Sequence, residues 1–204
     1  MTYIEEIAAY KQGKSKVCLE DGTVWILYKG ELRTYRLKAG MEISEALYDE
    51  IQVEVIGKRA KKRALHLLEK MDRTEAVLRE KLRQNEYPPE AVDAAIEYVK
   101  SFHYLDDLRY AKNFIRSYQE SRSRKRLQMD LLAKGISKEL MEQAFEEEYE
   151  GEETQLIYQL LKKRGYDGNN ADIKEQRRIY TFLMRKGFRS EDILKAMKCS
   201  DYLT

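Results

Sequence analysis

One pattern of apolar residues occurs three times in this chain, at intervals of about 50 residues. In each copy, two apolar residues four positions apart precede a third apolar residue, a glutamate and three further apolar positions. The three copies are Leu78, Leu82, Tyr87, Glu90, Val92, Ala95, Ile96; Leu127, Leu131, Ile136, Glu139, Met141, Ala144, Phe145; and Ile179, Leu183, Phe188, Glu191, Ile193, Ala196, Met197. Such a repeat predicts a row of similar units, none of which buries a large core by itself.

The middle of each copy has the residues of a helix end followed by a new helix start. Gly135 and Gly187 each follow a lysine, and glycine readily adopts the left-handed conformation that closes a helix. In the first copy Glu86 stands at this position, so we expect Asn85 to adopt the left-handed conformation instead. Pro89 suits the first position of the next helix, where its missing N–H is not needed.

Helical periodicity continues from about Lys58 onward and is interrupted only by such signals. The predicted helices are 58–71, 74–85, 89–102, 106–120, 123–134, 138–149, 152–164, 173–186 and 190–198. They group into three-helix repeats at 57–104, 105–150 and 151–204. Because units of this size must stack on their neighbours, we expect a mainly α fold with tandem three-helix modules in an elongated curved array.

Residues 1–56 differ from the rest and predict a small N-terminal α+β unit, a hairpin plus a helix. Two β-rich runs end and begin at Asp21-Gly22, which favours a two-residue hairpin turn with positive φ at both residues. Further elements are a strand with Ile4, Ile7 and Tyr10, a short helix with Leu32, Tyr35, Arg36 and Leu37, and a helix capped by Ser44.

Residues 104–118 join the first predicted module to the second. Asp106 is placed to cap a helix by accepting a hydrogen bond from a free first-turn N–H. Leu105 and Tyr110 have the spacing of a hydrophobic staple, which fixes the direction in which the chain enters a helix. Tyr110 and Phe114 lie on one helical face. We therefore expect Leu105, Asp106, Tyr110 and Phe114 to set the packing between the two modules.

The composition excludes several classes of protein. Charged residues make up 36% of the chain, and the formal net charge is only +2, so overall charge does not identify a partner. Without a long apolar run or a basic-then-apolar leader, we expect a soluble, cytoplasmic monomer with no membrane contact. Cys18 and Cys199 lack Cys-x-x-Cys spacing, and His66 and His103 lack metal-ligand spacing, so we expect neither a disulfide nor a metal site.

No catalytic arrangement is present in the sequence either. It lacks a phosphate-binding Gly-x-x-x-x-Gly-Lys-Ser/Thr loop, and it lacks a nucleophile with a plausible histidine partner. Asp106 and Asp107 are adjacent carboxylates, but helix capping accounts for them. We expect no enzyme activity, no catalytic residues and no cofactor.

Positive charge gathers in particular helices. Residues 122–126 place four cations near a predicted helix start, where the helix dipole disfavours them. Such a local cost indicates an anionic partner, either phosphate or an acidic protein surface, although solvated helix faces with internal ion pairs are the alternative. More cations populate the third module. As a hypothesis, we place the binding surface on Lys58, Arg59, Lys62, Arg63, Arg79, Arg116, Arg122, Arg124, Lys125 and Arg126.

Several longer motifs resemble those of the RecX family, which regulates the bacterial recombinase RecA. They are Arg-Thr-Glu-x-x-Leu-Arg-x-Lys-Leu from Arg73, Tyr-x-x-Glu-x-Val-x-x-x-Ile from Tyr87, and Tyr-Leu-Asp-Asp-x-Arg-Tyr-Ala-x-x-Phe from Tyr104. Leu-x-x-x-Leu-x-x-Lys-Gly-Ile from Leu127 and Phe-Leu-Met-Arg-Lys-Gly-Phe from Phe182 also fit. The resemblance covers roughly residues 58–198. Glu86 and His103 depart from it, because the family usually has glycine at both positions.

The resemblance implies a non-enzymatic modulator that lies in the groove of the RecA–DNA filament. Such proteins inhibit ATP hydrolysis, strand exchange and filament growth, and they act in recombination, DNA repair and the SOS response. Single-stranded or duplex DNA is then expected to bind weakly through the basic faces. Two alternatives remain open from the residues themselves. One is a free-standing helical DNA-binding regulator, and the other is a protein-binding helical scaffold for which DNA is irrelevant.

Overall fold

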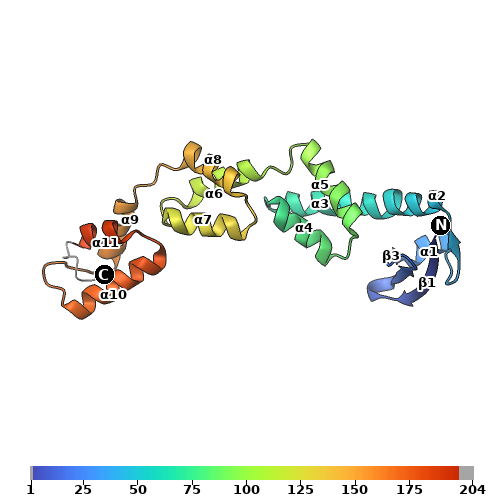
Figure 1. Cartoon of the computed structure of the whole chain (residues 1–204), viewed down its shortest axis with the longest axis horizontal. Coiled ribbons are helices and arrows are strands. Elements are labelled where there is room, and N and C mark those ends of the chain that lie inside the picture. Colours follow the sequence, from blue (N-terminus) through green and yellow to red (C-terminus); the bar gives the residue numbers. More distant parts are fainter. Residues whose placement is uncertain (1, 198–204) are drawn as a thin grey trace. The chain divides into compact units, whose positions relative to one another are not determined.

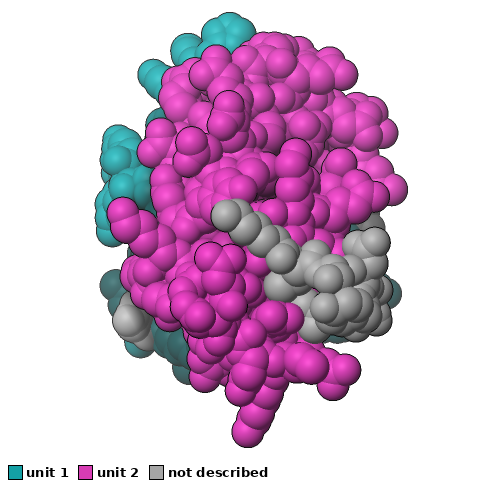
Figure 2. Space-filling model, turned by 90° about the vertical axis from the view of Figure 1, so that its left-hand side faces the viewer, with its two compact units in different colours: residues 1–106 teal, residues 107–204 magenta. Residues whose placement is uncertain are grey.

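The computed structural model describes residues 2–197, and the chain divides into two compact units. Unit 1 is Met1–Asp106 and unit 2 is Asp107–Thr204, shown in teal and magenta in Figure 2. The predicted mainly α fold is confirmed, with three three-helix modules and a small N-terminal α+β unit. Within the described residues, no helix is both long enough and apolar enough to span a bilayer. Cys18 is a free thiol in this range, and Cys199 lies outside the described residues.

Unit 1 begins with a four-stranded antiparallel sheet in the order β3-β2-β1-β4. The strands are β1 (Thr2–Ala9), β2 (Lys14–Leu19), β3 (Val24–Tyr28) and β4 (Glu42–Ile43). Residues of β2 and β3 alternate between buried and more exposed, as expected for a sheet with one face on the core. Trp25 is fully buried on that face.

Residues 20–23 lie between β2 and β3, and the pairing of Leu19 with Thr23 leaves a three-residue loop. The prediction of a two-residue turn at Asp21-Gly22 is therefore wrong. The N–H of Leu19 donates to the carbonyl of Thr23 at 2.9 Å and closes the ladder one pair beyond the strands. Of the three loop residues, Gly22 alone has positive φ, at 84°. The carboxylate of Asp21 instead accepts from the N–H of Thr23 at 2.8 Å. A type I turn followed by a left-handed glycine explains this geometry.

Helix α1 (Lys29–Thr34) ends before Leu37, to which the prediction extended it. Arg36 adopts a left-handed φ of 52°, and the N–H of Leu37 donates back to the carbonyl of Leu32 at 3.0 Å. These two features close the helix early, because a left-handed residue interrupts the helical path. The first strand is also shorter than predicted, since β1 ends before Tyr10.

A continuous helical segment links the sheet to the first module (Figure 1). It consists of α2 (Glu45–Glu50), the π-helical η2 (Ile51–Gly57) and α3 (Lys58–Lys70). The predicted cap by Ser44 is confirmed, because its Oγ accepts the N–H of Leu47 at 3.3 Å. The helix crosses the predicted boundary at residue 56 without a break.

Helices α4 (Glu75–Gln84) and α5 (Pro89–Ser101) complete the first module, and Pro89 occupies the predicted first helical position. The prediction that Asn85 turns left-handed is wrong, because Glu86 does so, with φ of 64°. Asn85 keeps a negative φ and uses its side-chain amide to donate to the carbonyl of Lys81 at 2.7 Å. Glu86 thus adopts the same left-handed conformation as Gly135 and Gly187 at the equivalent positions, although it is not glycine.

Sheet and helices of unit 1 share one hydrophobic cluster. It includes Trp25 from β3, Ile51 from the π-helical turn, Ala64 from α3, Leu82 from α4 and Val99 from α5. The N-terminal strands therefore share a core with the first module instead of enclosing one of their own.

Unit 2 holds the second and third modules, each with its own hydrophobic cluster. The helices are α6 (Asp107–Tyr118), α7 (Arg124–Ala133), α8 (Lys138–Glu148), α9 (Glu153–Lys163), α10 (Ile173–Lys186) and α11 (Ser190–Met197). Every repeated apolar position of the second and third copies is buried. The repeat thus corresponds to the core of each module.

The second and third modules meet where α10 ends and α7 begins. The Oγ of Ser123 accepts the N–H of Arg126 at 3.2 Å and donates to the carbonyl of Lys186 at 2.7 Å. Gly187 has a left-handed φ of 92°, and a Cβ there would lie 2.7 Å from the Ser123 oxygen. Glycine is therefore required both by the helix end and by the close approach of the two modules.

Candidate functional site

Among the predicted binding residues, Arg59 makes contacts with several other parts of unit 1. Its guanidinium donates to the carbonyl of Ile26 at 2.8 Å, forms an ion pair with Glu31, and lies over the ring of Tyr28 with 4.9 Å to the centroid. It thus joins α3 to the edge strand β3. Because these contacts use several of its donors, Arg59 has a structural role in unit 1.

Arg79 belongs to a network of charges between α4 and α5. It forms ion pairs with Glu75, at 2.7 Å, and with Asp93, while Lys100 reaches Glu75 at 2.6 Å. Partial burial acts to raise the pKa of the Glu75 carboxyl, but the hydrogen bonds and charges of Lys100 and Arg79 outweigh it and lower that pKa. Arg79 therefore stabilises the packing of two helices.

The three remaining predicted cations of the first module lie on α3 and are more available. Lys58 forms an exposed ion pair with Glu54, four residues earlier. Arg63 donates to the side-chain oxygen of Asn85 at 3.0 Å. Lys62 is exposed, and none of the described carboxylates lies within ion-pair distance of it. Exposed contacts of this kind contribute little to stability, so a partner can displace them at small cost.

At the start of α7, Arg122 and Arg126 share one carboxylate. Arg122 lies 2.7 Å and Arg126 lies 3.0 Å from oxygens of Asp130, whose side chain is 16% exposed. Arg122 also lies over the ring of Tyr118, 4.0 Å from its centroid. Asp130 therefore compensates part of the positive charge that the helix dipole disfavours at this end of α7.

The other predicted cations of the second module differ in availability. Arg116 makes a bidentate contact with Glu148, with its Nε at 3.0 Å and its Nη2 at 2.7 Å from one carboxylate oxygen. Arg124 is exposed, and its guanidinium stacks over Phe145, 4.9 Å from the ring centroid. Lys125 is exposed, and no ion pair links it to another described residue.

The predicted packing residues lie on both sides of the boundary between the units. Leu105 is buried in the cluster of unit 1, while Tyr110 and Phe114 pack against the cluster of the second module. Asp106 directly precedes α6, as expected for a cap. Contact between Leu105 and Tyr110 stays a prediction, as does a role of these residues in setting the angle between the modules.

The exposed cations described above form helix surfaces that suit binding. Among residues 2–197, no group of three or more His, Cys, Asp or Glu side chains could hold a metal ion. The available chemistry is that of lysine and arginine side chains on helix surfaces, which suits phosphate or carboxylate partners. The structure adds what sequence spacing could not predict, namely the carboxylates that neutralise Arg79, Arg116, Arg122 and Arg126. The structure also shows a face of exposed cations on α10, which was not among the predicted sites.

Comparison with known families matches all three helical modules. Residues 60–98 match the first three-helix domain of RecX, residues 106–144 the second and residues 151–197 the third. "Regulatory protein RecX" of Caldanaerobacter subterraneus is 31% identical over 163 residues, covering 79% of this chain and 80% of that protein. This chain belongs to the RecX family.

Other RecX proteins extend the similarity to the N-terminal unit. The Clostridium beijerinckii "Regulatory protein RecX" is 28% identical over 208 residues, covering 97% of this chain and 95% of that protein. The crystal structure of a regulatory protein RecX superposes with a TM-score of 0.64 at 23% identity, over 97% of this chain and 99% of that one. RecX from Lactobacillus salivarius gives a TM-score of 0.61 at 20% identity, over 70% of this chain and 95% of that one. At these identities, the two structures support the fold alone.

Proposed function

We propose that this RecX protein regulates RecA by binding the RecA–DNA filament and inhibiting its ATPase and recombinase activity. The observation that carries the proposal is the match of all three modules to the RecX domains, in order, across residues 60–197. The protein acts by binding, without catalysis and without a cofactor.

The contact with the filament lies on the available cations of the first two modules. Lys62, Arg63, Arg124 and Lys125 are the predicted cations that form no ion pair with another described residue. The paired cations, such as Arg79 and Arg122, already have internal carboxylate partners, Asp93 and Asp130. Availability matters because a cation with an internal carboxylate must give up that partner before it binds another anion.

The central experiment measures the DNA-stimulated ATPase of the host RecA with and without the full chain. The expected result is a fall in the steady-state ATPase rate that saturates with increasing RecX protein. An unchanged rate at saturating protein, with folding verified by circular dichroism, would contradict the proposed function.

A matched pair of lysines tests where the contact lies. Lys125 and Lys138 are both exposed, and each stands in the first turn of a helix of the second module. Lys125→Glu is expected to weaken inhibition of RecA several-fold, whereas Lys138→Glu makes the same change in net charge and leaves inhibition near wild type. Equal effects of the two substitutions would show that net charge, and not position, controls binding.

A further inference from the structure

The third module carries a basic face that has almost no internal neutralisation. Helix α10 contains five cations, Lys174, Arg177, Arg178, Arg185 and Lys186, and one acid after its cap, Glu175. The single ion pair on this helix among the described residues joins Arg178 to Glu175 at 3.8 Å, near the limit for such a contact. All five cations are exposed.

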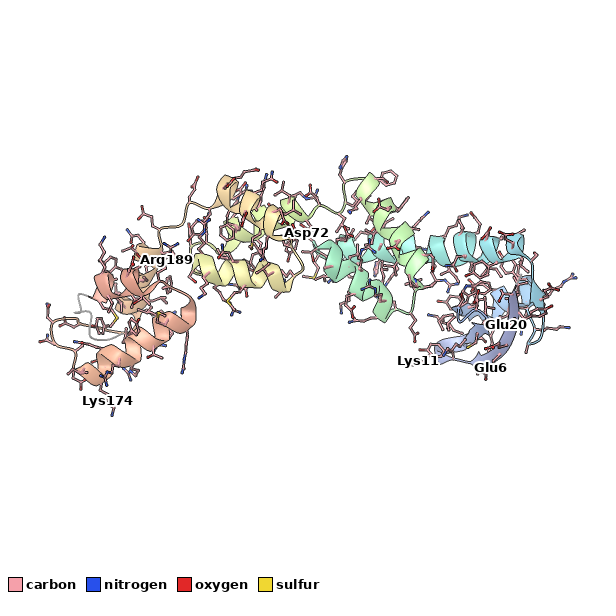
Figure 3. The ribbon with its side chains drawn as sticks, viewed as in Figure 1. Glu6, Lys11, Glu20, Asp72, Lys174 and Arg189 are labelled. Atoms are coloured by element: carbon pink, nitrogen blue, oxygen red, sulfur yellow. The ribbon has the colours of Figure 1, made fainter. Side chains whose placement is uncertain are left out.

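Helical geometry places three of these cations in a row. Positions 174, 178, 181 and 185 follow spacings of four, three and four residues, so Lys174, Arg178, Thr181 and Arg185 lie along one side of α10. The buried Ile179 and Leu183 belong to the side that packs on the module core. At about 1.5 Å per residue, the row is roughly 16 Å long. Figure 3 shows Lys174 at one end of α10, with its side chain directed away from the module.

A second helix adds to the same face. Arg164, at the end of α9, stacks its guanidinium over the ring of Phe182 with 3.7 Å to the centroid. The ammonium of Lys186 lies 5.7 Å from the same centroid. Two cations, Arg164 after α9 and Lys186 on α10, therefore contact the Phe182 ring next to the row on α10. The Arg164 side chain covers part of this ring.

This arrangement has a local cost. Lys174 lies in the first turn of α10, where the helix dipole disfavours a cation, and it is four residues from the like charge of Arg178. A like-charge pair at this spacing destabilises a helix by about 0.2–0.5 kcal/mol. Asp172 caps this helix and Glu175 lies in its first turn, so they offset part of the cost at the helix start. No described carboxylate lies within ion-pair distance of Lys174, Arg177 or Arg185, so their charge remains accessible.

We propose that the face formed by Lys174, Arg178 and Arg185, with Arg164 and Lys186 beside it, binds the phosphate backbone of duplex DNA. Arginine suits this partner because its planar guanidinium can donate two hydrogen bonds to one phosphate. Duplex DNA has one negative charge per about 1.7 Å of axis, which is dense enough to meet several cations of this row at once. Single strands are bound largely by stacking on open aromatic rings, and Arg164 covers the Phe182 ring here. This surface is separate from the recombinase contact proposed above and does not depend on it.

The test measures binding of a fluorescently labelled 20-base-pair duplex to the full chain by anisotropy, without RecA, between 50 and 200 mM salt. The variant combines Lys174→Gln, Arg178→Gln and Arg185→Gln, since glutamine keeps the helix propensity and removes the charge. Loss of three phosphate contacts lowers the slope of log affinity against log salt by about 2.7, from about 0.9 per contact. At 100 mM salt, the affinity of the variant for the duplex falls on the order of a hundredfold.

A control with the same change in net charge replaces three exposed lysines of unit 1, Lys11, Lys29 and Lys38, by glutamine. Its duplex affinity is expected to stay within about threefold of wild type, since screening at this salt limits the effect of distant charges. Thermal unfolding checks that both variants are folded.

Three outcomes would overturn the proposal: an unchanged slope in the α10 variant, an equal loss in the control, or no duplex binding by the wild-type chain at 50 mM salt. A loss confined to a labelled single strand of the same length would overturn the assignment to duplex DNA. Because RecA is absent, this measurement remains valid whether or not the chain inhibits the RecA ATPase.

Discussion

The start of α7 and the exposed face of α10 have similar charge in the sequence but different surroundings in the structure. Both place cations in or near the first turn of a helix, where the dipole disfavours them. At α7, Asp130 pairs with both Arg122 and Arg126 and offsets part of their charge, and the Arg124 guanidinium stacks on Phe145. On α10, Asp172 caps the helix start, and the one ion pair among the described residues joins Arg178 to Glu175 at 3.8 Å.

The difference shows that a count of cations does not measure the positive charge available to a partner. A single carboxylate one helical turn away can convert a basic cluster into a stabilising contact within the module. Where no such carboxylate is present, the charge stays accessible and its local cost remains. The sequence placed the basic surface of unit 2 at the start of α7, whereas in the structure the most available cations of unit 2 lie on α10.

The largest stability effect is expected at the joint that connects these two regions. Gly187→Ala forces a left-handed conformation on alanine, which costs about 1–2 kcal/mol, and brings its Cβ 2.7 Å from the Ser123 oxygen. Displacing Ser123 also weakens its hydrogen bond to Lys186, worth about 1 kcal/mol. Urea unfolding should show a loss of about 2–3 kcal/mol.

Gly165→Ala serves as the control for the joint. Gly165 is also left-handed, with φ of 65°, but a Cβ there meets no atom within 4 Å. Its loss should stay near the conformational cost of about 1–2 kcal/mol. Equal losses at the two glycines would mean that the Ser123 contact adds nothing to stability.

A smaller effect is expected when the start of α7 is made to resemble α10. Asp130→Asn removes the carboxylate that Arg122 and Arg126 share, so stability should fall by about 1 kcal/mol. Two released arginines can also raise the salt slope of duplex binding by up to about 1.8. Glu146→Gln, an exposed acid on α8, makes the same change in charge and should alter neither property measurably. If Asp130→Asn leaves DNA binding unchanged, neutralisation is not what separates the two regions.

The smallest effect on stability is expected at Glu75, the carboxylate that pairs with Arg79 and Lys100 in unit 1. Glu75 has a pKa below its ordinary value of 4.5 in the folded state, so it binds protons less readily there than in the unfolded chain. It therefore contributes stability at pH values above the ordinary pKa, and the contribution is lost as the pH falls through the lowered folded pKa. Glu75→Gln should cost roughly 0.5–1 kcal/mol at pH 7 and progressively less in acid. Unfolding measured across this pH range checks it, with the exposed Glu5→Gln as the control; a difference independent of pH would contradict the assignment.

Local signals predicted most of the fold. Helical periodicity located all nine helices described in the three modules within a few residues, because apolar residues at helical spacing become part of a core. Capping residues such as Ser44 and Gly187 were also predicted correctly, since their effect depends on a few neighbouring backbone groups. Glu86 was missed because the turn keeps its left-handed shape even without glycine.

The candidate site was less predictable. Arg59 was counted as a binding residue, yet it reaches Ile26 and Glu31, which are 33 and 28 residues away in the sequence. Arg116 likewise meets Glu148 from another helix. Such long-range pairings leave no local pattern, so helix periodicity could not separate structural cations from available ones.

The sequence by itself determined the helical repeat, its capping and its membership of the RecX family, because these depend on residues close together in the chain. Only the tertiary structure decided which charges remain available, how the N-terminal sheet joins the first module, and why Gly187 must approach Ser123. The physical reason is the distance along the chain over which each interaction acts. Backbone capping and amphipathic periodicity act over one or two helical turns, whereas neutralisation of a surface charge depends on whichever carboxylate the fold brings within about 4 Å.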